Sequence, residues 1–196
     1  MGGSIPEIDE AGKDYNISFV FDPEGNQVAR HRKMHLFDID VKGGQSFKES
    51  DTFTAGDEVT VFDTPWGKIG LCICFDFRFP ELSRLMVLKG AQVLVVPAAF
   101  NMTTGPAHWE LLFRQRAVDG QCYTVGVAPA RDEKGCYVSY GNSIVVSPWG
   151  EVLWRAGAEE TFQVVELDME QIQQVRQQLP LLSARREDVY EVREKK

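Results

Sequence analysis

The feature that most constrains this fold is an alternation of short apolar runs with helical patterns through the middle of the sequence. The run at 92–97 is continuously apolar, as expected for a strand covered on both faces. Pro80 and Gly90 mark the start and the end of a helix. The elements expected in this region are strands at 68–73, 92–97 and 122–128 and helices at 80–89 and 106–119.

Three further patterns predict β-hairpins, because apolar runs flank turn residues such as Asp22-Pro23-Glu24-Gly25. The paired runs are 16–21 with 27–32, 59–62 with 68–73, and 142–147 with 151–154. A polar helix is expected near 169–178. Hairpins combined with strand–helix–strand units predict an α/β protein with a mixed sheet and helices packed on it. Active sites of such proteins lie outside the carboxyl ends of strands, near helix N-termini.

Charge and composition exclude several functions. The 196 residues carry a net charge of −8, so the general basic footprint of a nucleic-acid binder is missing. Nothing favours attraction to an anionic membrane, and no apolar run reaches the length of a transmembrane helix. The first residues lack the pattern of a signal peptide. We therefore expect a cytoplasmic protein with no nucleic-acid or membrane partner.

The four cysteines are expected to be reduced thiols, since a chain of this size needs no disulfides. No metal site is expected, because the C-x-C spacing of Cys72 and Cys74 is too tight for the usual zinc loop. Cys72 and Cys122 read as core residues and Cys136 as an exposed loop residue.

The most informative segment is GLCICFDFRFPE, residues 70–81. Cys74 falls where the strand ends, and such a junction can hold a nucleophile above a sheet. The backbone N–H of Phe75 could then bind a developing oxyanion. The alternative is a small buried apolar side chain, the commonest fate of a free cysteine.

A cysteine nucleophile needs a base and a group that favours the thiolate. None of the three histidines sits in a diagnostic motif, and His108 has an ordinary place near the start of a helix. Lys33 is another candidate, because period 2 puts Arg30 and Arg32 on one strand face and Lys33 on the other. A solvated basic strand end is the alternative. With Lys33 and a helix start nearby, we expect a lowered pKa and fast alkylation at Cys74.

Three segments together resemble the nitrilase superfamily of carbon–nitrogen hydrolases: RKMHLFDID around Lys33, GLCICFDFRFPE around Cys74, and NMTTGPAHWELLFRQRA at 101–117. FKES at 47–50, APARD at 128–132 and YVSYGNS at 137–143 resemble the omega-amidase branch. The resemblance implies a four-layer αββα sandwich and a homo-oligomer, dimer or larger. It also implies a Glu–Lys–Cys triad in which Cys74 matches the nucleophile, Lys33 the lysine, and Glu49 a further glutamate close by.

The main departure from the family is that the triad glutamate has no counterpart; a smaller one is Asn142 in GNS, where related sequences often carry GHS. In the family the triad glutamate precedes a GGSIPE-like segment, which here stands at residues 2–7, so Glu7 is not assigned as the base. We therefore interpret residues 1–196 as one carbon–nitrogen hydrolase domain that lacks N-terminal strand–helix elements.

The activity implied by the resemblance is hydrolysis of small dicarboxylate monoamides through a cysteine thioester, with release of ammonia and with no cofactor or metal. Two alternatives stay open. One is a sister-branch amidase acting on deaminated glutathione or N-carbamoyl amines, and the other is an inactive fragment without the triad glutamate. The residues expected to bind the substrate are Phe75, Phe100, Asn101 and Thr103.

Overall fold

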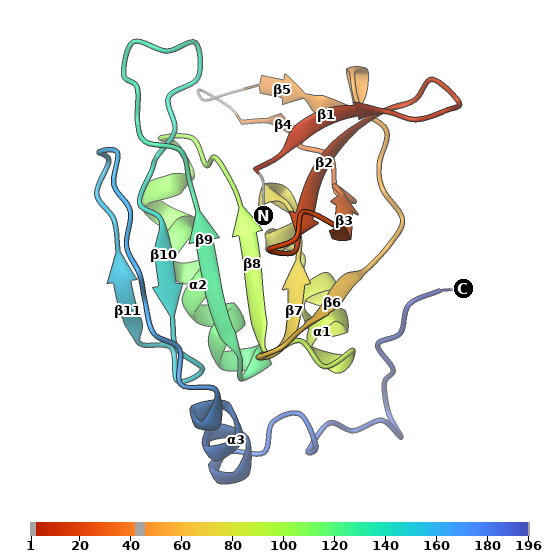
Figure 1. The fold of residues 1–196 in the computed structure, drawn as a ribbon, viewed down its shortest axis with the longest axis vertical. Helices are drawn as coiled ribbons and strands as arrows, with labels where there is room; N and C mark the ends of the chain where they lie inside the picture. Colours follow the sequence, from red (N-terminus) through yellow and green to blue (C-terminus); the bar gives the residue numbers. More distant parts are fainter. Residues whose placement is uncertain (1–2, 42–45, 196) are drawn as a thin grey trace.

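The computed structural model describes residues 3–41 and 46–195 and contains three sheets (Figure 1). The largest has six strands in the order β11-β10-β9-β8-β7-β6. Its strands are β6 (Thr60–Thr64), β7 (Gly67–Leu71), β8 (Val93–Pro97), β9 (Tyr123–Val127), β10 (Ile144–Val146) and β11 (Val152–Arg155). The three predicted hairpins are confirmed, since β2 pairs with β3, β6 with β7 and β10 with β11, all antiparallel.

A second sheet is formed by β1 (Ile5–Ile8), β2 (Asp14–Phe21) and β3 (Gln27–Arg32). Val20 of β2 packs on Phe62 and Leu71, so this sheet lies against the β6–β7 end of the large one. The short strands β4 (Asp38–Asp40) and β5 (Ser46–Lys48) pair separately and lead into the 3₁₀ helix η1 (Glu49–Asp51). The sequence patterns did not predict β1, β4, β5 or η1.

The core lies between the large sheet and two helices, α1 (Pro80–Leu88) and α2 (Gly105–Gly120). Figure 1 shows both helices on the same side of the sheet. Trp109 and Phe113 of α2 are fully buried there. Gly126 of β9 lies so close that an added Cβ would stand 2.5 Å from the Phe113 ring, so glycine lets α2 approach the sheet. α3 (Met169–Gln178) lies at the end of the sheet and buries Ile172 against Val93 and Tyr123.

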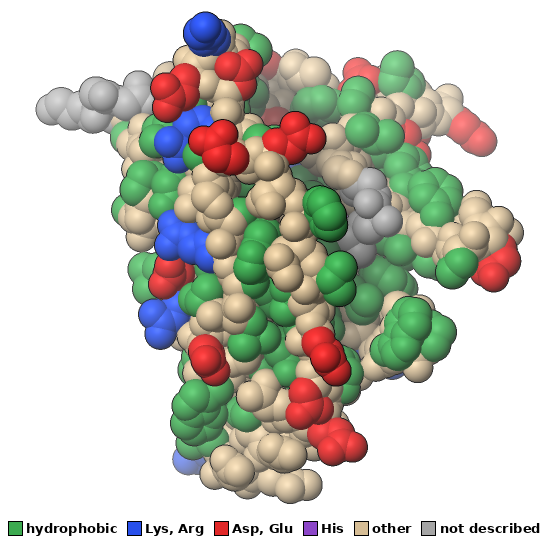
Figure 2. Space-filling model, turned by 60° about the vertical axis from the view of Figure 1, so that its left-hand side comes forward, with side chains coloured by type: hydrophobic (Ala, Val, Ile, Leu, Met, Phe, Trp, Pro, Cys, Tyr) green, Lys and Arg blue, Asp and Glu red, His purple; other side chains and the backbone are tan. Residues whose placement is uncertain are grey.

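The opposite face of β9–β11 is only partly covered. Hydrophobic side chains are exposed on and beside it, including Val127, Leu153, Phe162 and Val164. Figure 2 brings this side forward and shows hydrophobic side chains with acidic ones above and below them. None of the helices among the described residues is both long and apolar enough to cross a membrane.

Strand direction determines where the site lies. β7, β8 and β9 run parallel, so their carboxyl ends meet at one edge of the sheet. The 3₁₀ helix η2 (Cys74–Arg78) starts just beyond β7. The residues that follow β8 and β9, Ala98 and Ala128, lie at the same edge and line one pocket with Cys74.

Candidate active site

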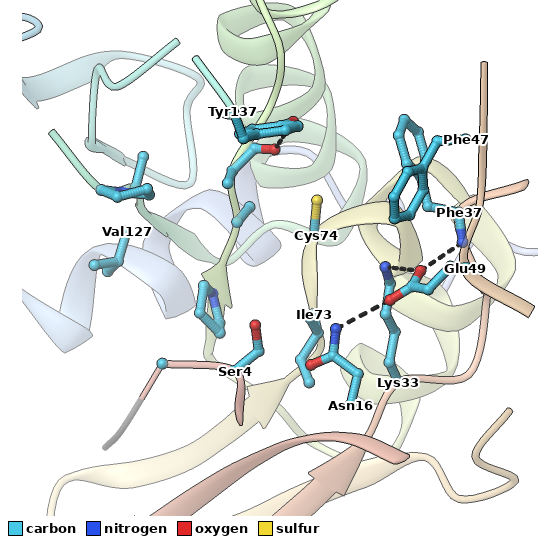
Figure 3. Close-up of a pocket in the computed structure, with 16 residues that line it drawn as sticks. Ser4, Asn16, Lys33, Phe37, Phe47, Glu49, Ile73, Cys74, Val127 and Tyr137 are labelled. Atoms are coloured by element: carbon cyan, nitrogen blue, oxygen red, sulfur yellow. Dashed lines mark hydrogen bonds and ion pairs between the residues drawn. The ribbon is translucent and has the colours of Figure 1, made fainter. Parts of the chain in front are cut away.

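A pocket of about 610 Å³ opens at this edge of the sheet (Figure 3). It is mostly apolar, with a few polar side chains that converge on it, as is usual for small-molecule sites. The polar or ionisable side chains on its wall belong to Ser4, Asn16, Lys33, Glu49, Cys74 and Tyr137. The apolar part is formed by Phe37, Phe47, Ile73, Pro97, Ala98, Ala99, Val127, Ala128 and Pro129.

Cys74 lies at a sharp turn between strand and helix. Ile73 before it is extended, whereas Cys74 has a φ of +47°, which an L-residue adopts only under tertiary constraint. Cys74 is also the first residue of η2, where the first N–H groups have no partner within the helix, and the first backbone bond runs from the Asp76 N–H to the Ile73 carbonyl. The turn thus presents the thiol of Cys74 to the pocket. The role of the Phe75 N–H as an oxyanion donor stays a prediction.

The thiol of Cys74 is not activated in the predicted way. Burial raises its pKa above the ordinary value, although the Lys33 charge, a hydrogen bond with the Ala99 backbone and the Arg78 charge act in the opposite direction. The expectation of a lowered pKa is therefore wrong. Lys33 does favour the thiolate, but desolvation costs more. Because Cys136 is exposed, it will compete with Cys74 for alkylating reagents.

The other two cysteines are core residues, as predicted. Burial raises the pKa of Cys122 to about 12, and the pKa of Cys72 lies well above its usual value for the same reason. All four cysteines are free thiols.

Lys33 and Glu49 form a buried ion pair at the pocket wall. The Lys33 Nζ lies 2.5 Å from the Glu49 Oε2, and the two residues are 4% and 5% exposed. Glu49 also accepts hydrogen bonds from the Phe37 N–H at 2.6 Å and from the Asn16 Nδ2 at 3.0 Å. The alternative of a solvated strand end is therefore wrong for Lys33, and Glu49 is buried with it. In Figure 3 the Cys74 sulfur lies between this pair and Tyr137.

The strand register before Lys33 is as predicted. Arg30 and Arg32 both contact Glu7, at 3.4 and 2.8 Å, whereas Lys33 turns into the pocket just after β3 ends. Glu7 does not line the pocket, in keeping with its exclusion as a base. The GGSIPE-like segment at 2–7 is described from Gly3 onward, and Gly2 lies outside the described residues.

The predicted substrate contacts are not among the residues that line this pocket. Phe75 packs edge-on against Phe37 and Phe79, at ring distances of 5.0 and 5.4 Å. Phe100 is buried, and its ring packs against Trp109.

Asn101 and Thr103 precede α2. The Asn101 Oδ1 accepts hydrogen bonds from the N–H and the hydroxyl of Thr104, at 2.8 and 2.9 Å, so it holds the chain where α2 begins. Thr103 is exposed. Their place after β8 was predicted correctly, but the residues after β8 on the pocket wall are Ala98 and Ala99.

Three polar residues of the pocket were missed, and the first is Ser4, which directly precedes β1. Asn16 comes from β2 of the neighbouring sheet, and Tyr137 comes from the long loop between β9 and β10. The Tyr137 hydroxyl donates a 2.6 Å hydrogen bond to the Ala99 carbonyl, and burial raises its pKa to about 12. Tyr137 opens the YVSYGNS stretch, which was the only sequence signal pointing to it.

Arg78 supplies a cation close to the pocket. Its guanidinium lies 4.5 Å from the centre of the Phe100 ring and 3.1 Å from the His108 Nδ1. It influences the ionisation of both Cys74 and Tyr137. No carboxylate in the described part of the chain forms an ion pair with it, and no cluster there has the His, Cys, Asp and Glu content of a metal site.

The fold and this pocket define an α/β protein with a thiol, an ammonium and a carboxylate in one site. The Carbon-nitrogen hydrolase family model matches residues 1–177, and the chain belongs to this family. It is 55% identical to the omega-amidase NIT2 of Bos taurus over 196 residues, which are all of this chain and 71% of that protein.

Two solved structures are also similar. Nit3 of Saccharomyces cerevisiae, a member of branch 10 of the nitrilase superfamily, matches with a TM-score of 0.86 and 45% identity, over 94% of this chain and 65% of that one. The NitFhit protein of C. elegans matches with a TM-score of 0.86 and 38% identity, over 97% of this chain and 47% of that one. The chain thus spans less than two thirds of either solved chain, and its fold is of the nitrilase type.

Proposed function

We propose that this chain cleaves the amide C–N bond of small dicarboxylate monoamides, such as succinamate or 2-oxoglutaramate, and carries the acyl group as a thioester on Cys74, the first stage of an amide hydrolysis. The observation that carries the proposal is the pocket that Cys74 shares with the buried Lys33–Glu49 pair. The similarity to proteins named omega-amidases supports the choice of substrate class.

The reaction has two stages. The Cys74 sulfur attacks the amide carbonyl carbon, and the C–N bond then breaks, so that the nitrogen leaves as ammonia with the proton given up by the thiol. The hydrolysis is complete once water attacks the thioester carbonyl, which yields the free acid, restores the thiol and requires a base. In both stages the carbonyl oxygen becomes negative, and the Lys33 ammonium and the Phe75 N–H are the donors we assign to it.

Glu49 has a positioning role in this proposal. Its two oxygens accept hydrogen bonds from Lys33, Phe37 and Asn16, so it holds the ammonium in one place. Both of its oxygens are therefore already engaged within the site. Glu49 is the one carboxylate among the described residues of the wall, and we assign no residue of this chain as the general base.

Arg78 favours an anionic substrate. A guanidinium without a carboxylate partner is suited to hold a second carboxylate by two parallel hydrogen bonds. Phe75, Phe100, Asn101 and Thr103 then act by shaping the region around Arg78 and the start of α2. This role would distinguish dicarboxylate monoamides from neutral amides or N-carbamoyl amines.

The test is a panel of amides scored for ammonia release and for acyl adducts on Cys74 by peptide mapping. The panel comprises succinamate, 2-oxoglutaramate, deaminated glutathione, an N-carbamoyl amine and propionamide. We expect adducts and ammonia first with the dicarboxylate monoamides and neither with Cys74→Ala. Arg78→Met should remove the preference for succinamate over propionamide. If no amide on the panel yields an adduct or ammonia, the proposal is wrong.

We also propose that the chain forms homo-oligomers, with residues 1–196 as part of one hydrolase domain. Support comes from exposed apolar side chains beside a groove of about 550 Å³ on α2, namely Leu111, Val118 and Trp149. Light scattering after size exclusion should give a dimer or larger, and Leu111→Glu should shift it toward monomer. The four free thiols support a cytoplasmic location, which fractionation would test.

A further inference from the structure

The carboxylate of Asp76 gathers five hydrogen-bond donors from two distant parts of the chain. Its Oδ1 accepts from the Met34 N–H, the His35 N–H and the His35 Nδ1, at 3.2, 2.8 and 2.8 Å. Its Oδ2 accepts from the His31 Nε2 at 3.0 Å and from the Ile73 N–H at 3.0 Å. Asp76 is fully buried, so these bonds form away from water.

His31 joins Asp76 to a second strand. Its Nε2 faces the Asp76 carboxylate, which accepts, and its Nδ1 lies 2.9 Å from the Thr60 hydroxyl of β6. The Thr60 hydroxyl also lies 3.2 Å from the Arg30 carbonyl. The contact between His31 and Asp76 is therefore held from β6 as well as from β3.

Residues 31–35 carry Lys33 between three residues that bond to Asp76, and Asp76 itself lies two residues after Cys74. Resting on the proposed function, we propose that Asp76 is a positioning residue that locks the Lys33 segment to the Cys74 turn. The lock sets the ammonium where it acts on the thiol and on the oxyanion. Asp76 does so without touching the substrate, since it is absent from the pocket wall.

The direction in which the pKa of Cys74 moves when Asp76 loses its charge separates a positioning role from a direct charge effect. Removing a negative charge close to a thiol makes the thiolate easier to form. Losing the position of Lys33 makes the thiolate harder to form, because the ammonium is displaced. The other charged or titratable groups that act on Cys74 are Glu49, Arg78, Tyr137 and the buried Cys72, and none of them has a hydrogen bond to Asp76.

The experiment follows the rate of Cys74 alkylation by iodoacetamide against pH, in a Cys136→Ser background with peptide mapping. We expect Asp76→Asn to raise the midpoint pH of this alkylation curve by about one unit. This lies near the lower end of the range for a thiol that loses a nearby opposite charge, here the Lys33 ammonium. Lys33→Met should raise it similarly, and adding Asp76→Asn to Lys33→Met should have no further effect. Asp168→Asn, at the N-cap of α3, is the matched control and should leave the midpoint unchanged.

A second variant covers the case in which Asp76→Asn does not fold. His35→Phe keeps the stacking on Phe79, whose ring lies 3.7 Å away, and removes one bond to Asp76. We expect a smaller rise of the midpoint in the same direction. An unchanged or lowered midpoint in a folded variant overturns the proposal, as does an effect of Asp76→Asn that persists with Lys33→Met. Alkylation needs no amide turnover, so failure of the amidase proposal would be seen separately.

Discussion

At the residue scale, comparing Lys33 with Arg32 distinguishes a cation that acts in the site from one that lies outside it. The two are neighbours in sequence, but Lys33 is buried beside Glu49, whereas Arg32 lies 2.8 Å from Glu7 and outside the pocket. Lys33→Ala should slow acylation of Cys74 by succinamate by about 10²–10³, the usual cost of losing an oxyanion donor. Arg32→Ala should change this rate by less than about threefold, because the half-buried Arg32–Glu7 ion pair lies outside the pocket and such pairs have small effects.

The measurement is the rate at which the acyl adduct appears by intact-protein mass spectrometry. Equal losses for the two variants would contradict the assignment of Lys33.

Asp76 should also control stability in acid. Burial by itself raises the pKa of this carboxyl, but hydrogen bonds from His31 and His35 outweigh burial and lower it from 3.8 to about 2. A lowered pKa means that the stabilisation is complete above about pH 4 and is lost as the pH falls toward 2. The contribution is about 2 kcal/mol, since one pKa unit corresponds to roughly 1.4 kcal/mol.

Urea unfolding at several pH values between 5 and 2.5 measures this contribution. At pH 5 the Asp76→Asn variant should be less stable than the unsubstituted protein. Between pH 5 and 2.5 its free energy of unfolding should fall by less than that of the unsubstituted protein. Parallel curves for the two proteins would show that Asp76 does not carry this part of the acid sensitivity.

At the element scale, the strands and helices that a local pattern defines were predictable. Apolar runs between turn residues predicted β2, β3 and β6–β11, and Pro80 with Gly90 bounded α1 to within one residue. The 3₁₀ helix that begins at Cys74 was missed. Its sequence has no helical period, and its conformation depends on Asp76 bonding to residues more than 40 positions away.

The same distinction applies to the site. Cys74 and Lys33 were found because each ends a strand with a readable pattern, and Glu49 was found through the resemblance of FKES. Asn16 and Tyr137 reach the pocket from another sheet and from an irregular loop, so no local period indicates them. The pKa of Cys74 was mispredicted because burial depends on the whole fold.

The close packing of α2 on the sheet predicts that a larger residue at Gly126 lowers the stability of the protein. Gly126→Ala would place a methyl group 2.5 Å from the Phe113 ring, inside a buried core. Overpacking of this kind typically costs 1–3 kcal/mol, so we expect a loss of about 2 kcal/mol in the free energy of urea unfolding. Gly157→Ala is the control, because nothing lies within 4 Å of its added Cβ. A similar loss in both variants would mean that α2 is not held as close as described.

At the scale of the whole molecule, the pocket has the groups for acylation but a single carboxylate on its described wall. Thioester hydrolysis needs a base that removes a proton from water, within hydrogen-bond reach. Glu49 is held by three donors, and burial puts the pKa of Tyr137 at about 12, so neither is suited to that task at neutral pH.

We therefore expect a polypeptide of these 196 residues to form the acyl-enzyme and then stall. Mixed with succinamate, it should release about one equivalent of ammonia and gain the mass of the acyl group on Cys74. Hydroxylamine, a nucleophile that needs less activation than water, should clear the adduct and restore thiol reactivity. Cys74→Ala should show neither change. Steady ammonia release over many turnovers, abolished by Cys74→Ala, would contradict this expectation and show that Glu49 or another group of the chain activates water.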